Sequence, residues 1–451
     1  MKVQSMHRSI SDYELLPRVI RKGVLTDFTL RGLGMDTKFE AGVEYLLRFI
    51  PHEQNNSPIA QTLSRHWLYE GITAVADEDG YIRFSHKLDR EETYTIRVSK
   101  ADDEKRTLIT NLRLFVAEDD LWSRTPMKGN THCHVCVSVD GEEDPARVAA
   151  MHRKAGYDYL AITDHHLIGG SLIAIDRLKD IPHGISLYKG EEVHVPDPYI
   201  HAVNVGADLG GIGVNTYYDN NKEKCDAEVQ AIAESLNADE LPEDVLPIDV
   251  AWRTWIAKMI HDHGGIAIAA HPFWIWEAHN TRNAMLRYMA EHKLFDAMEV
   301  LGGQHPGSME ANMQISFWND MRADGIHMPI VGADDAHIRH TVWSDSDCFN
   351  KVYTVAFMND PSFEGFKDAI LNRWTVAVDQ YDEATPHIVG TYRLTRFLVF
   401  LLEQYFPIHD ELCFAEGQLI GDACIGDESA FALLPAVCNR VKEFEKKFFG
   451  R

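Results

Sequence analysis

The sequence lacks long apolar runs, and this limits its relation to membranes. The longest such run is Phe397–Leu402, which is directly followed by Glu403. It is far shorter than the roughly 20 residues that a helix needs to cross a bilayer. The first 21 residues contain no apolar core of the kind that a signal peptide carries. We therefore expect a cytoplasmic protein without a membrane partner.

Basic residues and paired cysteines are also scarce. The 44 Lys and Arg residues are outnumbered by 69 Asp and Glu residues, which gives a net charge of −25. This charge argues against a nucleic-acid polymer as a partner. It does not exclude a small phosphorylated substrate, because bound metal ions can reverse the local field. The seven cysteines are odd in number and scattered, as is typical of a reduced intracellular protein.

A chain of 451 residues is too long to fold around one ordinary hydrophobic core, and we expect three regions. Residues 1–122 show short alternating strands and turn signals, which predict a β-sandwich-like domain with either a structural or a substrate-binding role. Residues 123–385 alternate strands with helices, which predicts an α/β fold with mostly parallel strands. Within them, residues 207–247 read as a long loop. Residues 386–451 form a helical extension, and a homo-oligomer remains open.

Metal-binding side chains follow several predicted strands. Because the carboxyl ends of parallel strands meet at one edge, these side chains are expected to lie together. A lone His is more often structural, but five such strand ends in one region indicate a metal site. Earlier in the chain, His132 and His134 would point the same way on an extended strand. Each of five predicted strands is followed by such residues: the strand at 159–163 by Asp164-His165-His166, that at 185–188 by Glu191-Glu192, that at 266–270 by His271, that at 295–298 by Glu299, and that at 328–331 by Asp334-Asp335-Ala336-His337.

Five motifs occur in a fixed order between about residues 127 and 340. Together they resemble the motifs of the PHP (polymerase and histidinol phosphatase) metallohydrolases, and the N-terminal β module is similar to that of the carbaryl-hydrolase-like branch. The resemblance implies a distorted (β/α)7 barrel with two to three divalent ions of Mn, Fe or Zn, up to a trinuclear metal centre. The motifs are Thr131-His-Cys-His134, Thr163-Asp-His165, Gly190-Glu-Glu192, Ala270-His-Pro272 and Asp335-Ala-His337.

The resemblance also implies a set of nine metal ligands. His132, His134, Glu192 and Asp335 would bind the first ion; Glu192, His201 and His271 the second; and Asp140, His165 and His337 the third. Glu192 and Asp335 would be the catalytic residues that hold a metal-bound hydroxide. Imidazoles and carboxylates suit the ions named above, and clustered cations can activate water.

Two features of this stretch leave alternatives open. One extra residue separates Ser138 from Asp140 relative to the family pattern, so Asp140 and the third ion are in question. Cys133 and Cys136 form a CxxC pair, which could indicate a redox or zinc–thiolate site, although no second cysteine pair follows. On a strand, Cys136 would share a face with His132 and His134.

The expected activity is hydrolysis of small phosphate mono- or diesters. The alternatives are hydrolysis of a carboxyl or carbamate ester at the same site, and a non-catalytic metal-binding scaffold. Arg339 and His305 are candidates for binding the substrate. Trp274 could line a substrate pocket or the core. His261 and His263 are expected to stabilise a helix C-terminus and not to bind metal.

Overall fold

The computed structural model describes residues 12–53, 69, 71–105, 107–196, 200–275, 279–302, 309–338, 349–381 and 385–451. The chain forms two compact units. The first comprises Met1–Arg124, Arg396–Glu411 and Asn439–Arg451, and the second comprises Thr125–Thr395 and Leu412–Cys438. Residues of the C-terminal helices thus contribute to both units, and the expected division at residues 122 and 385 stays a prediction.

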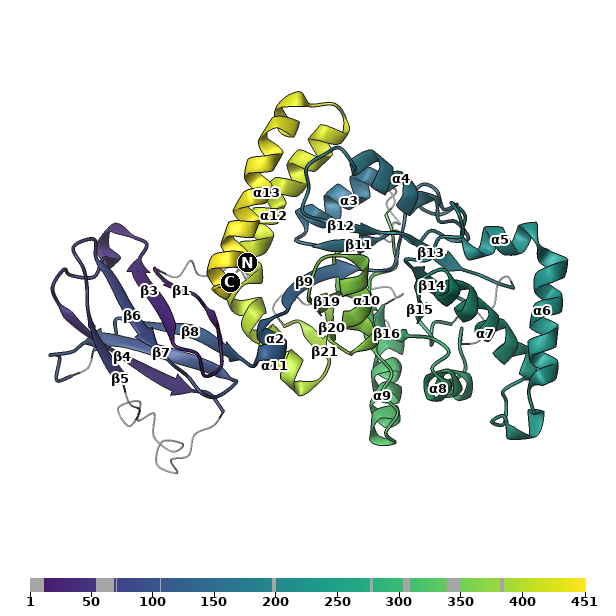
Figure 1. Cartoon of the computed structure of the whole chain (residues 1–451), viewed down its shortest axis with the longest axis horizontal. Coiled ribbons are helices and arrows are strands. Elements are labelled where there is room, and N and C mark those ends of the chain that lie inside the picture. The colour runs from purple at the N-terminus through teal and green to yellow at the C-terminus, as the bar shows by residue number, and fades with distance from the viewer. Residues whose placement is uncertain are drawn as a thin grey trace. The chain divides into compact units, whose positions relative to one another are not determined.

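The first unit is rich in β-structure, as predicted, and contains two sheets (Figure 1). Buried side chains from both sheets, such as Leu30 and Ile96, form one core. Tyr94, Ile96 and Val98 are buried and the intervening Thr95 and Arg97 are half-buried, which agrees with the expected alternation, although Ser99 after them is buried as well. One sheet has the order β1 (Tyr13–Leu16), β3 (Thr26–Gly32), β6 (Tyr81–His86); the other has the order β2 (Val19–Arg21), β8 (Thr110–Ala117), β7 (Thr93–Lys100), β4 (Glu44–Pro51), β5 (Gly71–Val75), with η1 (Met35–Thr37) and α2 (Asp119–Trp122) between strands.

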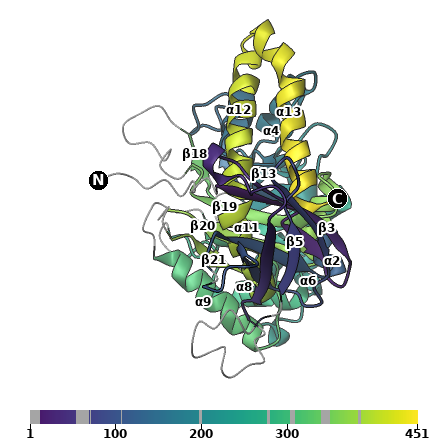
Figure 2. The ribbon, with the colours of Figure 1, turned by 90° about the vertical axis from the view of Figure 1, so that its left-hand side faces the viewer.

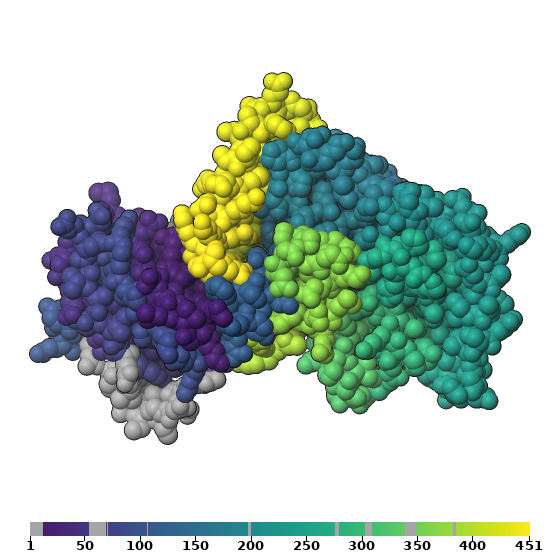
Figure 3. Space-filling view, viewed as in Figure 1, coloured from purple at the N-terminus to yellow at the C-terminus, as the bar shows by residue number. Residues whose placement is uncertain are grey.

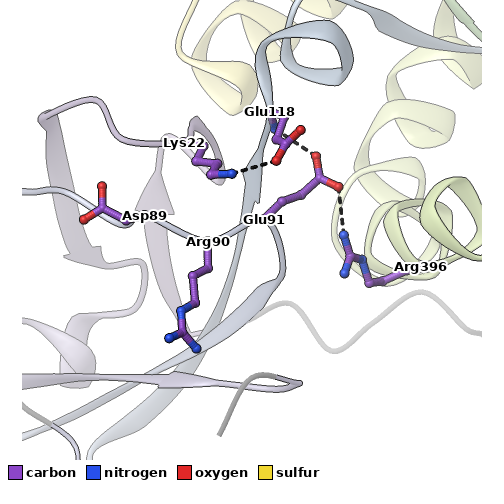
Figure 4. Close-up of a pocket in the computed structure, with 6 residues that line it drawn as sticks. All are labelled: Lys22, Asp89, Arg90, Glu91, Glu118 and Arg396. Atoms are coloured by element: carbon purple, nitrogen blue, oxygen red, sulfur yellow. Dashed lines mark hydrogen bonds and ion pairs between the residues drawn. The ribbon is translucent and has the colours of Figure 1, made fainter. Parts of the chain in front are cut away.

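The first unit carries a polar hollow of about 430 Å³ (Figure 4). Four of its six lining residues form two ion pairs: Lys22 Nζ is 2.7 Å from Glu118 Oε1, and an Arg396 nitrogen is 2.9 Å from Glu91 Oε1. Because the carboxylates offset these cations, the hollow gives no clear preference for an anionic ligand. The choice between a structural and a substrate-binding role for this unit stays open.

The second unit is a mixed α/β fold built on two larger sheets and a two-stranded one. The six-stranded sheet has the order β12 (Ser186–Tyr188), β11 (Tyr159–Ala161), β9 (Thr125–Asn130), β19 (Val352–Met358), β20 (Thr375–Asp379), β21 (His387–Val389). The five-stranded sheet has the order β13 (Gly190–Val193), β14 (Ala202–Val205), β15 (Ile266–Ala269), β16 (Ala297–Gly302), β17 (Ile330–Ala333). The small sheet pairs β10 (Cys133–His134) with β18 (Ala336–His337).

The remaining helices follow β10 in the sequence, and two of them, α12 and α13, run side by side in both views (Figures 1 and 2). Among the described residues, no helix is long and apolar enough to cross a membrane. The helices are α3 (Pro145–Lys154), α4 (Gly169–Leu178), α5 (Val214–Asn220), α6 (Lys222–Ser235), η3 (Ala238–Glu240), α7 (Pro247–Asp262), α8 (Asn283–His292), α9 (Glu310–Ala323), α10 (Phe363–Leu371), α11 (Tyr392–Gln404), α12 (Phe406–Cys424) and α13 (Glu428–Phe449).

The two edge strands of the five-stranded sheet, β13 and β17, each contact the six-stranded sheet. At one edge, His165 and Glu192 form a parallel bridge between the end of β11 and β13. At the other, Thr354 Oγ1 of β19 bonds both the N–H and the carbonyl of Gly332 at 2.8 Å. The α/β class is therefore confirmed, whereas the (β/α)7 barrel and the N-terminal sandwich stay predictions.

Two expectations about this unit are wrong. Its described strand pairs are not mostly parallel: five are parallel and five antiparallel. The expected loop at 207–247 contains α5 and α6, shown in teal at one edge of Figure 3. Cys225 and Val229 of α6 are buried one helical turn apart, and Ile232 packs beside them. Charged residues between them hide this narrow apolar stripe in the sequence.

A buried charge network anchors α3 within the second unit. The Arg153 guanidinium lies 2.7 Å from Asp158 and 2.9 Å from Glu416 of α12. It also donates to the carbonyl of Tyr157 at 3.1 Å. Burial opposes the charged form, but Cys413, Asp158 and Glu416 hold the pKa of Arg153 well above its ordinary value. The network is satisfied only while the cation is present.

We expect Arg153→Met to destabilise the protein by about 3–5 kcal/mol, because it leaves two buried carboxylates without their cation. Arg147→Met is the matched control, because Arg147 is exposed and its ion pair with Glu143 is long, at 3.5 Å. This substitution should lower the free energy of unfolding by less than about 1 kcal/mol. Urea unfolding followed by circular dichroism measures both. Equal losses in the two variants would contradict this account.

Candidate metal centre

The predicted HxH pair lies on a strand that is paired in register with the last predicted motif. Cys133 pairs with Ala336 and His134 with His337 in a parallel ladder. Side chains opposite each other in such a ladder lie on one face of the sheet. The rings of His134 and His337 accordingly stack with centroids 4.1 Å apart. His132, two residues earlier, faces the same region, with its ring 5.2 Å from that of His134.

The residues predicted for the first ion lie together. Asp335 Oδ1 is 3.2 Å from His132 Nε2 and 2.9 Å from His134 Nε2. Glu192 Oε2 is 3.5 Å and 3.7 Å from the same two nitrogens. All but Asp335 have fully buried side chains. We call this set the first group.

The residues predicted for the second ion adjoin the other oxygen of the same glutamate. Glu192 Oε1 is 2.9 Å from His201 Nδ1 and 3.3 Å from His271 Nε2. His201 directly precedes β14, and His271 follows β15, so neighbouring strands supply both imidazoles. This second group therefore shares the Glu192 carboxylate with the first.

The third group includes Asp140, the residue whose register the extra residue put in question. Asp140 Oδ2 is 3.1 Å from His165 Nε2 and 3.2 Å from His337 Nε2, and these two nitrogens are 3.3 Å apart. Val139 is fully exposed, so the extra residue is accommodated as a bulge into solvent. Asp140 thereby still reaches its expected partners.

The side chain of Asp164 holds the loop that carries Asp140. Asp164 Oδ1 accepts the N–H groups of Val135 at 2.8 Å and Ser138 at 3.1 Å. A Cβ at Gly141 would lie only 2.3 Å from the carbonyl oxygen of Val135, so the loop closes on itself more tightly than any other residue would allow. Asp164 is thus a loop anchor.

The spacing and chemistry of the donors fit divalent ions. Donor atoms about 2.1 Å from one ion lie about 3.0–3.4 Å apart, close to the separations within each group. His132 Nε2 and Glu192 Oε2 are buried without a hydrogen-bond partner although nitrogens and oxygens surround them. Buried polar atoms rarely remain so. Their lone pairs converge on shared space, as ligands of an ion do, and nitrogen and oxygen donors suit Mn, Fe or Zn.

The charges of the buried carboxylates also favour the binding of a cation. Burial opposes the charged form of His132, but Asp335, Glu299 and Glu192 raise its pKa well above the ordinary value. Burial likewise opposes ionisation of Asp335, yet His132 and its neighbours lower the pKa of that carboxyl. In the metal-free protein, a proton on His132 therefore offsets part of the carboxylate charge, whereas burial lowers the pKa of His134 to about 3. A divalent cation can replace that proton.

Backbone strain is concentrated at the same place. His271 has φ of 22°, Asp335 of 51° and the neighbouring His166 of 62°. Non-glycine residues adopt such angles rarely, and they cluster at functional sites. The strain turns the His271 and Asp335 side chains inward directly after their strands end.

Sequence reasoning did not assign roles to two residues of the centre. Glu299 of β16 lies 2.8 Å from His132 Nδ1 and accepts the His271 N–H at 2.7 Å, so it orients two of the predicted ligands. His194 Nε2 lies 3.2 Å from Glu192 Oε2. The signal for His194 was its place two residues after Glu192, on the same face of β13's extension.

The other candidates lie elsewhere or are not described. Arg339 and His305 fall outside the described residues, so their substrate-binding role stays a prediction. The Trp274 ring lies 5.7 Å from that of His201, at the wall of the second group. His263 Nδ1 lies 2.8 Å from the Met259 carbonyl at the end of α7, which confirms its structural role.

The cysteines next to the centre and the second histidine pair make contacts outside the centre. Cys133 is buried with Sγ 4.0 Å from the carbonyl of Ala161, whereas Cys136 is exposed. No disulfide joins two cysteines in the described part of the chain. His261 pairs with Asp296 at 2.7 Å on the surface.

No family model and no curated protein matches the sequence. Similar solved structures include a two-domain protein with a predicted PHP-like metal-dependent phosphoesterase from Bacteroides vulgatus, at 15% identity over 61% of this chain and 69% of that one (TM-score 0.40). Another is a proposed metal-dependent phosphoesterase from Bifidobacterium adolescentis (18%, 48% and 89%, TM-score 0.34). A third is an amidohydrolase from Chromobacterium violaceum with bound sulfate and no metal (17%, 46% and 87%, TM-score 0.30).

PHP-like proteins, the family that the motifs predicted, are therefore among the structural neighbours of this chain. The narrower resemblance to the carbaryl-hydrolase-like branch stays a prediction. Because all three TM-scores lie below 0.5, we base the function on the geometry of the centre itself.

We expect Glu299→Gln to weaken metal binding by about 10- to 100-fold, the usual effect of removing a carboxylate that orients a ligating histidine. Competition with a chromophoric chelator measures the affinity. Glu291→Gln, on the exposed face of α8, is the control and should leave it unchanged. Equal affinities in all three proteins would show that Glu299 does not support the ligands.

We expect Asp140→Ala to lower the metal content by one ion per chain and to keep the rest, because Asp140 belongs to the third group alone. Elemental mass spectrometry of protein purified without added metal measures this content. An unchanged content would remove Asp140 from the ligands despite its position.

Proposed function

We propose that the chain is a metal-dependent hydrolase of small phosphate mono- or diesters. The observation that carries this proposal is the sharing of one carboxylate, Glu192, between the first and second donor groups. Ligands arranged in this way hold two ions close together, and His134 and His337 continue the set toward a third. Bound divalent ions would supply a nucleophile from water at neutral pH and offset negative charge on the phosphate.

The protein's own residues would hold and orient these ions. Glu192 and Asp335 have the central part, since each faces more than one imidazole and so fixes the spacing of the groups. Burial of His132, His134 and Glu192 excludes bulk water from the inner side of the centre. Trp274 would limit the space beside the second group.

Phosphate is favoured over an uncharged ester by the charge of the centre. The nine ligands include three carboxylates and no Lys or Arg, so an anionic substrate would depend on the ions for its binding. Several adjacent cations suit a phosphoryl group, whose oxygens can contact more than one of them. An anion such as inorganic phosphate should therefore bind the metal-loaded protein and not the metal-free one.

The rest of the proposal concerns setting and partners. The odd number and scattered positions of the seven cysteines support a cytoplasmic location. The net charge supports a small-molecule substrate over a nucleic-acid polymer. Two or three ions of Mn, Fe or Zn remain the proposed cofactors.

We expect the metal-loaded protein to hydrolyse aryl phosphate mono- or diesters faster than aryl acetates or carbamates. His132→Ala should reduce this activity by about 100-fold or more. Loss of a residue that only hydrogen-bonds to a metal ligand usually reduces activity by about 10- to 100-fold, and loss of the ligand itself should reduce it further. Release of nitrophenolate from parallel substrate panels measures both. His263→Ala, which is remote from the centre, is the control.

Each result has a definite meaning. Faster turnover of the carboxyl or carbamate panel would favour the alternative ester hydrolase. No turnover of either panel by protein that retains its metal would favour a metal-binding scaffold. Activity that is identical in wild type and His132→Ala would remove the centre from the reaction.

A further inference from the structure

His194 is a buried histidine at the centre that is not among the nine predicted ligands. It is 7% exposed and lies between the second and third groups. Its ring stacks on that of His201 with centroids 3.9 Å apart. Its Nε2 is 3.3 Å from His165 Nδ1 in hydrogen-bond geometry.

The backbone of His194 is held by a dedicated set of contacts. The His194 N–H donates to Asn215 Oδ1 at 2.8 Å, and Asn215 Nδ2 donates back to the His194 carbonyl at 3.0 Å. Asn215 lies in the first turn of α5, where the buried Glu191 carboxylate accepts the N–H groups of Val214 at 2.7 Å and Asn215 at 3.0 Å. His194 is thus fixed through three buried residues that do not touch the ligand atoms of the centre.

The orientation of His165 decides what His194 can do. His165 Nε2 faces Asp140 and His337, so this nitrogen can bind the third ion. His165 Nδ1 lies 2.7 Å from Glu192 Oε2, which has no hydrogen-bond partner, and 3.3 Å from His194 Nε2 in hydrogen-bond geometry. The proton of a neutral ring then lies on Nδ1, which can donate to His194 Nε2. Histidine ligands usually donate their second N–H to an acceptor, and this bond fixes the ring's tautomer and direction.

We propose that His194 is a positioning residue for the third ion: it accepts the Nδ1–H of His165 and thereby aims His165 Nε2 at Asp140 and His337. This proposal rests on the metal centre proposed above. A different role is tested beside it, because His194 Nε2 also lies 3.2 Å from Glu192 Oε2 and could itself bind an ion.

The test compares the metal content of four full-length proteins after dialysis against a chelator that leaves the wild type loaded. They are wild type, Asp140→Ala, His194→Ala and the double variant. If His194 acts through the third group, His194→Ala loses the same ion as Asp140→Ala, with about 10- to 100-fold weaker affinity for it. The double variant then loses no further ion, since both changes affect one site.

Two controls separate positioning from folding. His166→Asn changes the histidine whose ring lies 4.8 Å from that of His194, at a position where Asn tolerates the positive φ, and should keep all ions. His194→Gln retains an acceptor and should recover part of the third-ion affinity. Thermal unfolding followed by circular dichroism identifies any variant that has lost its fold.

The proposal is overturned if His194→Ala keeps every ion, or if the double variant loses one ion more than Asp140→Ala. It is also overturned if the wild type holds only two ions and Asp140→Ala loses none; the proposed hydrolase with a dinuclear centre would then still stand. A wild-type protein that binds no metal at all would instead remove the proposed function together with this inference.

Discussion

The arrangement of the centre depends on the carboxylate of Glu192. One of its oxygens faces His132 and His134, and the other faces His201 and His271. Burial of a carboxylate costs free energy unless cations or hydrogen bonds compensate the charge. Here, imidazoles lie close to both oxygens of the carboxylate. The positions of those imidazoles are therefore set by a single buried charge, and the surrounding strands hold it in place.

The fold meets this requirement with ordinary devices. Alternation along β13 places Glu191 and Glu192 on opposite faces, so the first carboxylate binds the start of α5 while the second faces the centre. The pairing of β10 with β18 brings His134 beside His337, although about 200 residues separate them in sequence. Positive φ at Asp335 and His271 then directs side chains inward from the strand ends. A small number of backbone features thus assembles donors from seven separate segments.

The sequence predicted which donor side chains lie together better than it predicted the architecture around them. Donors such as His132, Glu192 and His271 could be found because their motifs are short and local, and the structure brings them together as expected. The strand directions could not be found so easily, because short connections such as that from β13 to β14 permit antiparallel pairing without a sequence signal. Asp140 shows the limit of spacing rules: an exposed Val139 absorbs the extra residue, which only the three-dimensional path of the loop reveals. His194 was missed although it lies two residues after Glu192, because its contact with His165 joins two segments that are separate in the sequence.

The same electrostatics connects metal binding to the stability of the second unit. Without cations, carboxylates such as Glu192 and Asp335 stay ionised only because neighbouring imidazoles carry protons, as the opposite pKa shifts of His132 and Asp335 show. An ion that enters must displace protons from these rings, so its apparent affinity increases with pH over the range in which they titrate. Any ion that binds the folded chain and not the unfolded one also adds to the free energy of unfolding. Occupancy of the centre and order in the strand ends that form it are therefore expected to rise together.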